Sequence, residues 1–252
     1  MVPMKVSIIT VCYNRVATIG RTIESVLAQD YANIEYIVVD GASTDGTKEV
    51  VERYAARLAC FISEPDKGMY EALNKGIHRA TGDIIGVFHS DDVMPHASIV
   101  STIVKEMEAQ GADMLYGDGL FVRDGRVVRD WQGGAFHRWK VRLGWLPLHT
   151  TCYVRREVQL RVGDYDERYR IAADTDMLLR LCYDTPLKIC YLKAYLVSME
   201  MGGLSTDSRR RKEMWHEDVC IYQRHGMPGN LLKVLKMAWK IPQFIKAKWK
   251  RF

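Results

Sequence analysis

The sequence predicts an α/β fold in which a mostly parallel sheet carries helices on both faces. Two observations support this prediction. In the first half of the 252-residue chain, short apolar runs alternate with segments of helical periodicity, which is the pattern of parallel strands joined by crossover helices. The composition, 48% hydrophobic and 27% charged, is that of a globular protein, and one α/β domain of ~200–250 residues accommodates this length.

The elements of the first half follow one another along the chain. Apolar runs predict strands at residues 6–11, 34–39, around 60, and 84–88. Helical spacing of apolar residues predicts connecting helices at residues 16–28, 47–58, 69–79 and 97–109. Because ligands bind at the carboxyl ends of the strands in such sheets, the residues that end each strand are the candidates for a functional site.

The second half has a different pattern. Two strand-like segments precede an Asp124-Gly125 turn and a further strand, which together indicate a hairpin. The expected strands lie at residues 114–116, 120–123, 127–131, 150–154, 189–192 and 195–199. Helices are expected at residues 174–183 and 209–224. Glycine and proline at residues 226–229 then interrupt the pattern, so we predict a domain of residues 1–225 followed by a tail of residues 226–252.

The net charge of +5 is distributed unevenly along the chain. From Val219 to the C-terminus there are eight Lys and Arg residues and no Asp or Glu, whereas the preceding residues carry 28 basic and 31 acidic side chains. A basic tail on a mildly acidic body indicates that the positive charge acts locally, through the tail. This distribution argues against a protein that binds nucleic acid over its whole surface. A nucleic-acid binder that uses the tail alone remains a rival hypothesis, which a salt-dependent gel shift would test.

Cysteine usage and hydropathy indicate a cytoplasmic protein. The six cysteines form no C-x-x-C pair, which disfavours zinc-ribbon and thioredoxin-like sites and predicts reduced thiols. The longest uncharged stretches have twelve residues, short of the ~18 that a membrane-spanning helix needs. The N-terminal residues lack the pattern of a secretory signal.

Acidic residues follow two of the predicted strands. Asp40 ends the strand at 34–39, and the adjacent Asp91 and Asp92 follow the strand at 84–88. Two neighbouring carboxylates repel each other unless a cation is bound, and carboxylates completed by phosphate oxygens suit Mg²⁺ or Mn²⁺. Asp40 can accept the imide N–H of uracil, thymine or guanine. The alternative for all three is that they cap the following turns or helices.

The turn after the first strand carries no phosphate-binding loop. It reads TVCYNR, and neither G-x-x-x-x-G-K-[ST] nor G-x-G-x-x-G is present there. This disfavours P-loop NTPases, dinucleotide-dependent oxidoreductases and sugar nucleotidyltransferases.

Five motifs in this order and spacing resemble one family. They are SIITVCYNR, EYIVVDGASTDGT, DKGMYEALNKGI, GDIIGVFHSDD and IAADTDMLLR. Together they are similar to the family 2 glycosyltransferases with the GT-A fold, over about residues 4–225. Within that family the chain is similar to bacterial enzymes that build surface polysaccharides.

The resemblance implies roles for individual residues. Residues in contact with the nucleotide would be Thr10, Asn14, Asp40, Lys67 and Asp91. Asp92, together with Asp91, would hold Mn²⁺ or Mg²⁺.

The resemblance also implies a catalytic base. The base would be Asp174, although Ala173 replaces a usual Glu and leaves Asp176 as a rival. Asp174 also has a purely structural interpretation as the N-cap of the helix that follows.

These residues predict an enzyme. The predicted reaction is a metal-dependent, inverting transfer of a sugar from a nucleoside-diphosphate sugar, UDP-linked by expectation, to a lipid-linked saccharide. The alternative is a catalytically silent module that binds nucleotide sugars. The joint presence of strand-end acids and a candidate base favours catalysis, because a binder needs no base.

Three further features have open interpretations. Residues 202–213, GGLSTDSRRRKE, are either a loop that closes on the diphosphate or the solvated start of a helix. His149 is either a ligand or a structural histidine. Trp131, Trp139 and Trp145 either stack on sugar rings or pack in the core.

The tail is predicted to bind an anionic membrane surface. On a helical wheel for residues 231–241, Lys233, Lys236 and Lys240 fall within an arc of about 60° and apolar residues cover the rest. Pro242 ends or kinks this helix, and aromatic and basic residues alternate beyond it. The alternative is a helix packed on the body or on a second subunit.

Overall fold

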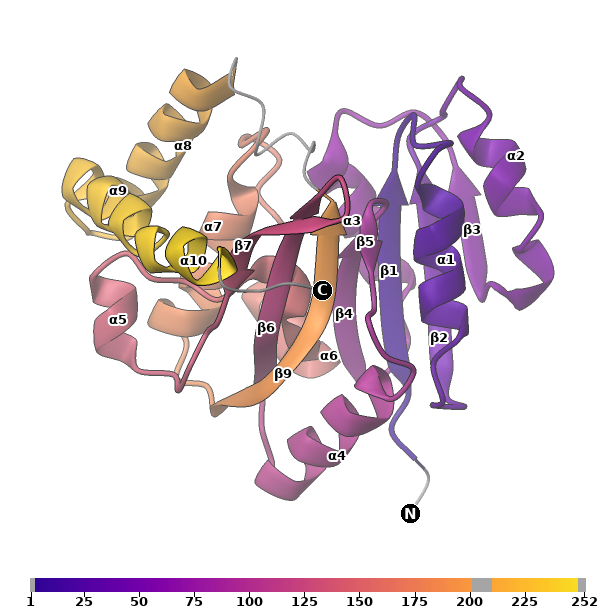
Figure 1. Ribbon diagram of the computed structural model, residues 1–252, viewed down its shortest axis with the longest axis horizontal. Helices are drawn as coiled ribbons and strands as arrows, with labels where there is room; N and C mark the ends of the chain where they lie inside the picture. Colours follow the sequence, from indigo (N-terminus) through magenta and orange to yellow (C-terminus); the bar gives the residue numbers. More distant parts are fainter. Residues whose placement is uncertain (1–2, 201–209, 249–252) are drawn as a thin grey trace.

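The computed structural model describes residues 3–200 and 210–248, and it confirms the α/β fold. One curled sheet runs through the molecule in the order β3-β2-β1-β4-β8-β6-β9-β5, and β7 pairs with β6 outside this path. Helices cover both faces of the sheet (Figure 1). Side chains of neighbouring residues in one strand therefore enter two separate cores: Ile9 lies in one and Ile8 in the other.

The first half forms the parallel part of the sheet, as predicted. Its strands are β1 (Val6–Cys12), β2 (Ile34–Asp40), β3 (Cys60–Ser63) and β4 (Ile84–His89). Its helices are α1 (Ile19–Leu27), α2 (Thr47–Glu52), α3 (Met69–Arg79) and α4 (Ile99–Gln110). The helix predicted at 47–58 ends early, and a short 3-10 turn, η1 (Ala55–Arg57), follows it.

Helix α1 begins three residues later than the periodicity predicts. The backbone N–H groups of Arg15 and Val16 donate to Thr47 Oγ1 and Asp45 Oδ2 in the loop after β2. These bonds hold the residues before α1 in a turn. The apolar spacing therefore includes residues that are not helical.

Two strands of the second half are longer than predicted, and one is shorter: the strand expected at residues 150–154 begins only at Tyr153, because His149–Thr151 form a 3-10 turn. The strands of this half are β5 (Asp92–Val93), β6 (Met114–Arg123), β7 (Arg126–Trp131), β8 (Tyr153–Arg155) and β9 (Ile189–Glu200). The segments predicted as pairs at 114–123 and 189–199 are single strands, β6 and β9, which run parallel with two register shifts. Gly117 lies in β6 because a Cβ there would lie 2.5 Å from Leu196 Cγ. Close packing therefore accounts for a residue that usually weakens strand patterns.

The remaining helices surround the second half of the sheet. They are α5 (Arg138–Arg142), η2 (His149–Thr151), α6 (Arg156–Val162), α7 (Ala173–Leu179), α8 (Arg211–Arg224), α9 (Gly229–Ala238) and α10 (Ile241–Ala247). A π-helical turn, η3 (Arg180–Asp184), continues α7. The sequence predicted neither α5 nor α6, because both are shorter than the window in which helical periodicity is visible.

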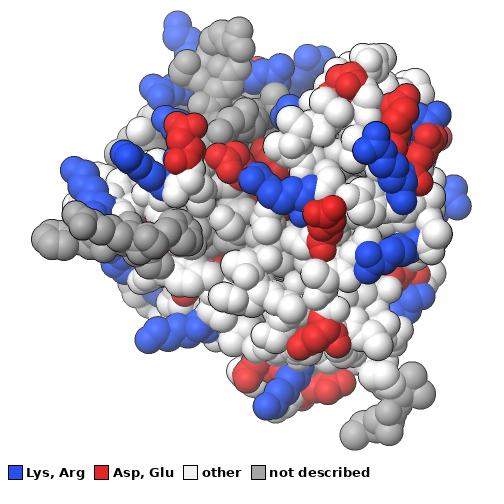
Figure 2. Space-filling view, turned by 45° about the vertical axis from the view of Figure 1, so that its right-hand side comes forward, with Lys and Arg blue, Asp and Glu red and all other residues white. Residues whose placement is uncertain are grey.

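Thiols and hydropathy agree with the sequence analysis. All six cysteines are free, as predicted, and Cys60 and Cys220 are the two that are partly exposed. Within residues 3–200 and 210–248, no helix has the length and apolar character needed to cross a membrane. On the face seen in Figure 2, acidic and basic side chains of the described residues are interspersed.

The tail packs on the body with its lysines inward. Lys233 on α9 is only 3% exposed, and burial lowers the pKa of Lys240 to about 7. The large apolar side chains exposed on α9 and α10 are Leu231, Val234, Met237, Ile241, Phe244 and Ile245. The predicted lysine arc therefore exists but faces the protein, and the apolar residues face solvent. The domain division at residue 226 stays a prediction.

Helix α10 is tied to the hairpin. The Nε of Arg129 on β7 donates to Gln243 Oε1 at 2.6 Å. Trp239 follows α9 directly, and its Nε1 donates to the carbonyl oxygen of Leu143, just after α5, at 2.9 Å. The last four residues of the tail, including the aromatic Trp249 and Phe252, lie outside the described residues.

Candidate active site

The carboxyl ends of the parallel strands bring the predicted acids to one edge of the sheet. In the register of the sheet, Cys12 of β1 lies opposite Asp40 of β2, and Val11 lies opposite His89 of β4. Asp91 and Asp92 follow His89 directly. The turn after β1, the end of β2 and the turn after β4 therefore share one edge, as expected for this class of sheet.

Asp40 is fully buried and engaged by hydroxyl groups. Its Oδ2 accepts from the Ser43 backbone N–H at 3.1 Å and from Ser63 Oγ at 2.8 Å. Its Oδ1 accepts from Ser43 Oγ and from Cys12 Sγ. Asp40 thus holds together the ends of β1, β2 and β3, and its contact with a base stays a prediction.

The turn after β1 is fixed by its own side chains. Asn14 has a φ of 52°, in the left-handed region that Asn tolerates, and its Oδ1 accepts from the Thr44 backbone N–H at 2.9 Å. Thr10 is fully buried, with its hydroxyl 3.1 Å from that of Tyr36. Asn14 therefore lies in the turn at the strand edge, whereas the Thr10 side chain is enclosed in the core.

Sequence analysis missed two residues beside Asp40. Tyr13 is 59% exposed, and Asp66 lies so close to Gly41 that a Cβ there would be 2.5 Å from Asp66 Oδ2. Burial raises the pKa of Asp66, and the charge of Asp40 adds to this. Asp66 precedes Lys67 in the DKGMY motif, and this position is the signal that could have identified it. Lys67 is exposed, and its backbone N–H donates to Glu71 Oε2 at 3.0 Å.

The acid pair after β4 contains an unpaired carboxylate oxygen. Asp92 is fully buried; its Oδ2 accepts from the His89 backbone N–H at 3.0 Å, and its Oδ1 has no hydrogen-bond partner. Burial and the charge of Asp91 raise the pKa of Asp92 well above its ordinary value. Asp91 is partly exposed.

The carboxylates of Asp91 and Asp92 suit a cation whose other ligands are the phosphate oxygens of a bound nucleotide. No cluster of three or more His, Cys, Asp or Glu side chains suited to a metal occurs among the described residues. One or two carboxylates with phosphate oxygens are nevertheless the usual set for Mg²⁺ bound with a nucleotide. The orphaned Asp92 oxygen beside Asp91 matches that chemistry, because an unpaired buried carboxylate is costly without a cation or a proton.

Asp174 lies in the first turn of α7 with one oxygen available. Its Oδ1 accepts from the Thr175 backbone N–H at 2.8 Å, and its own N–H lies 3.4 Å from the Tyr70 hydroxyl. No described residue bonds its Oδ2. Burial raises the pKa of Asp174, and the charge of Lys236 opposes this. The side chain is partly exposed.

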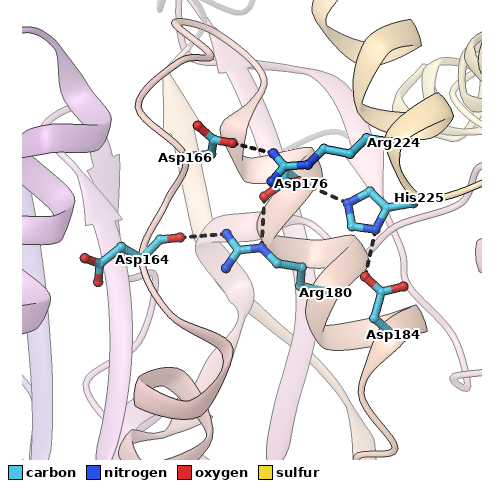
Figure 3. Close-up of a pocket in the computed structure, with 7 residues that line it drawn as sticks. All are labelled: Asp164, Asp166, Asp176, Arg180, Asp184, Arg224 and His225. Carbon is cyan, nitrogen blue, oxygen red and sulfur yellow. Dashed lines mark hydrogen bonds and ion pairs between the residues drawn. The ribbon is translucent and has the colours of Figure 1, made fainter.

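Asp176 is committed to a different network (Figure 3). Its two oxygens meet Arg180 Nε at 2.9 Å and His225 Nε2 at 3.0 Å. Burial alone would raise the pKa of Asp176, but these two partners lower it. The network lies at a pocket of about 480 Å³. Four acidic and three basic residues line this pocket and bind one another. The two rival acids of α7 therefore differ in their hydrogen-bond partners.

His149 is a buried structural histidine by its contacts. Its Nε2 is hydrogen-bonded to the Tyr165 hydroxyl, and its ring lies 6.0 Å from that of His89. Burial lowers the pKa of His149 to about 3, so the ring is neutral at neutral pH. It helps to pack the region between the acid pair and α7.

The three tryptophans divide between core and surface. Trp131 and Trp145 are buried and stack on each other with ring centroids 6.2 Å apart. Trp139 is 54% exposed on α5. Of the predicted closing loop at 202–213, residues 202–209 lie outside the described residues, and Arg211 begins α8.

Comparison with known proteins adds the family. The model of the family described as "Glycosyl transferase family 2" matches residues 7–167. A PGL/p-HBAD biosynthesis glycosyltransferase of Mycobacterium bovis is 29% identical over 205 residues, which are 79% of this chain and 78% of that relative.

Solved structures share the fold at low sequence identity. S. aureus TarS 1–349, in complex with UDP-GlcNAc, has a TM-score of 0.73 at 20% identity, covering 87% of this chain and 66% of that one. The mannosyltransferase PcManGT of Pyrobaculum calidifontis, in complex with GDP-Man and Mn²⁺, has a TM-score of 0.67 at 20% identity, covering 97% and 74%. This chain spans only 39% of the longer TarS structure.

The family match covers well over half of the chain and contains the strand-end acids described above. The chain therefore belongs to glycosyl transferase family 2, has the GT-A fold and is a glycosyltransferase.

Proposed function

We propose that this enzyme transfers a sugar, with inversion, from a nucleoside-diphosphate sugar to a lipid-linked saccharide, using Mn²⁺ or Mg²⁺. UDP is the proposed nucleotide. One observation carries the proposal: Asp174 keeps a free oxygen in a partly exposed position, whereas Asp176 has both oxygens engaged. Of the two rival acids, Asp174 is the one with an oxygen that no described residue binds, so it can accept a proton from an acceptor.

The proposed reaction is a single displacement. Asp174 takes the proton of the acceptor hydroxyl as its oxygen bonds to the sugar C1 from the face opposite the diphosphate. The bond from C1 to the diphosphate oxygen breaks, and the diphosphate leaves with the electron pair. Since burial raises the pKa of Asp174, its ionised form is a stronger base than an exposed carboxylate.

The acid pair is the proposed metal site. Asp91 and Asp92 would hold the cation, and a bound Mn²⁺ or Mg²⁺ would supply charge compensation for the leaving diphosphate. The supporting observation is the buried Asp92 oxygen without a partner.

The turns after β1 to β3 are the proposed nucleoside site. Tyr13 offers an exposed ring, Asn14 shapes the turn, and Asp66 offers an acceptor for a base N–H. Asp40, whose oxygens are already bonded, would support this edge from beneath. Lys67 is exposed next to Asp66 and is available to a phosphate.

The rival is a silent module that binds nucleotide sugars. A thermal-shift panel of UDP, UDP-GlcNAc and GDP-mannose, with and without Mn²⁺, tests donor choice, because a bound ligand stabilises the fold by mass action. Release of UDP from the stabilising donor then separates enzyme from module. Stabilisation without any turnover would support the module.

The proposed location is the cytoplasmic face of the membrane, with the tail as the contact. The apolar outer face of α9 and α10 would enter the interface, flanked by the exposed Lys246 and Lys248. No acid occurs after Asp218, so this face suits anionic lipid, whereas a second copy would place like charges together. This replaces the predicted lysine arc, which faces the protein.

Vesicle flotation tests this contact. Substituting both Val234 and Met237 with Ser changes the outer face and leaves the buried lysines in place. We expect binding to vesicles of anionic lipid to be lost, while Leu160→Ser, an equally exposed apolar site on α6, retains it. Equal flotation of all three proteins would refute the contact, and a dimer in place of flotation would assign the face to a second copy.

A further inference from the structure

A buried ion cluster joins the tail to α8. Asp218 on α8 is 1% exposed and is paired with Lys233 and with Lys236, whose Nζ lies 2.8 Å from Asp218 Oδ1. Burial would raise the pKa of Asp218, but the charges of Lys236 and Lys233 lower it to about 2. Both lysines come from the inner face of α9, so α9 brings positive charge into the body of the enzyme.

The same cluster reaches the first turn of α7. Lys236 Nζ donates to Thr175 Oγ1 at 2.8 Å, and Thr175 Oγ1 in turn donates to Asp218 Oδ1 at 3.0 Å. Thr175 is the neighbour of Asp174, and its backbone N–H is the group that binds Asp174 Oδ1. One ammonium group therefore lies two hydrogen-bonding steps from the proposed base.

Helix α8 holds the residues just before α7 as well. Glu217 accepts from the backbone N–H groups of Arg170, Ile171 and Ala172 at 2.8, 2.9 and 2.8 Å. The approach to α7 is thus fixed by Glu217, and its first turn by Asp218 with Lys236. A carboxylate that binds three successive N–H groups is strongly localised.

We propose that α9 completes the catalytic site, with Lys236 as the positioning residue that holds the first turn of α7, and with it Asp174, in place. The inference rests on the proposed role of Asp174 as the base. It assigns to the tail a part in catalysis that is separate from any membrane contact, because that contact would use the opposite face of the same helix.

Several groups surround Asp174, and Lys236 has a distinct effect among them. The titratable groups whose charges act with that of Asp174 are His89, Tyr70, Tyr165, Asp218, Tyr222, Lys233 and Lys236. The charge of Lys236 lowers the pKa of Asp174, and the charge of Asp218 raises it. Removing the ammonium group should therefore move the pKa of Asp174 upward.

The test compares Lys236→Met and Lys236→Arg with Lys105→Met, which removes an exposed lysine from α4. Calorimetry measures the affinity for UDP with Mn²⁺, and UDP release from the stabilising donor gives kcat as a function of pH. For Lys236→Met we expect unchanged UDP affinity and a kcat at least ~10-fold lower, as small displacements of a catalytic group produce. The acid limb of the kcat profile should move to higher pH, because the charge of Lys236 lowers the pKa of Asp174. Lys236→Arg should restore the acid limb, and Lys105→Met should match the wild type.

A second readout is independent of turnover. Carbon-13 NMR titration of the aspartate carboxyls, with Asp174 identified by its loss in Asp174→Asn, gives the pKa of Asp174 directly. An upward shift in Lys236→Met supports the inference, and an unmoved pKa with wild-type kcat overturns it.

The outcomes separate this inference from the proposed function. If Asp174→Asn keeps wild-type turnover, the proposed base is wrong. If Asp174→Asn is inactive while Lys236→Met is normal in kcat and pH profile, only the positioning role fails. Should Lys236→Met not fold, Lys236→Gln replaces it, which also removes the charge and keeps the pair of Lys233 with Asp218: reduced kcat with unchanged UDP affinity supports the role, and wild-type kcat overturns it.

Discussion

Replacing Asp218 with Asn tests the ion cluster that joins α8 and α9. In the folded protein the pKa of Asp218 is held at about 2, against an ordinary value of 3.8. One pKa unit corresponds to ~1.36 kcal/mol, so ionised Asp218 contributes about 2 kcal/mol at neutral pH. The side chain is 1% exposed, so solvent screening does not reduce this figure. Asp218→Asn should therefore lower the free energy of unfolding at pH 7 by about 2 kcal/mol.

The pH dependence makes this prediction specific. A carboxyl group with a lowered folded pKa stabilises the fold above its unfolded pKa and loses that effect as pH falls through the folded value. The difference between wild type and Asp218→Asn should thus shrink to about half at pH 3. Urea unfolding at pH 7, 4 and 3 measures it, with the exposed Asp30→Asn as control. A difference that stays constant from pH 7 to pH 3, or no difference at pH 7, would refute the reasoning.

Four further predictions concern the site and its supports. Asp174→Asn should keep UDP affinity but lose transfer by at least ~100-fold in a UDP-release assay, the lower range for loss of a general base. Asp92→Ala should abolish the Mn²⁺-dependent part of UDP binding in calorimetry, and unchanged affinity would contradict the metal assignment. Gly144 has a φ of +78°, and a Cβ there would lie 2.6 Å from the Leu232 carbonyl oxygen, so Gly144→Ala should lower the free energy of unfolding by more than ~1 kcal/mol. Burial lowers the pKa of His225, but its two acidic partners raise it above 6.5; its stabilising effect should be present below pH 6.5 and lost at higher pH, so His225→Gln should cost stability at pH 6 and little at pH 9.

The parallel half of the fold was predictable because its strands are buried on both faces. Each reads as a continuous apolar run, and the helices between them carry a regular apolar spacing. The acids at the ends of β2 and β4 could be identified for the same reason, since topology alone places strand ends at one edge. The second half was less predictable because Gly117 serves the close approach of Leu196, and a local pattern contains no sign of a neighbour 79 residues away.

The tail shows a different limit. A helical wheel identifies which side chains share a face, and Lys233, Lys236 and Lys240 do share one. It does not identify which face is buried, because that depends on Asp218, which lies on another helix. Likewise, sequence spacing could not separate Asp174 from Asp176, whose environments differ through His225 and Arg180.

The distribution of thiols makes the enzyme suitable for site-specific probes. Burial raises the pKa of Cys182 to about 12 and that of Cys190 to about 11, and Cys12 and Cys152 are buried as well. A maleimide reagent at neutral pH should therefore select Cys60, on the edge strand β3, and Cys220 on α8. Cys220 lies two residues from Asp218, so a fluorophore or spin label there would report how α9 is seated without any engineered cysteine.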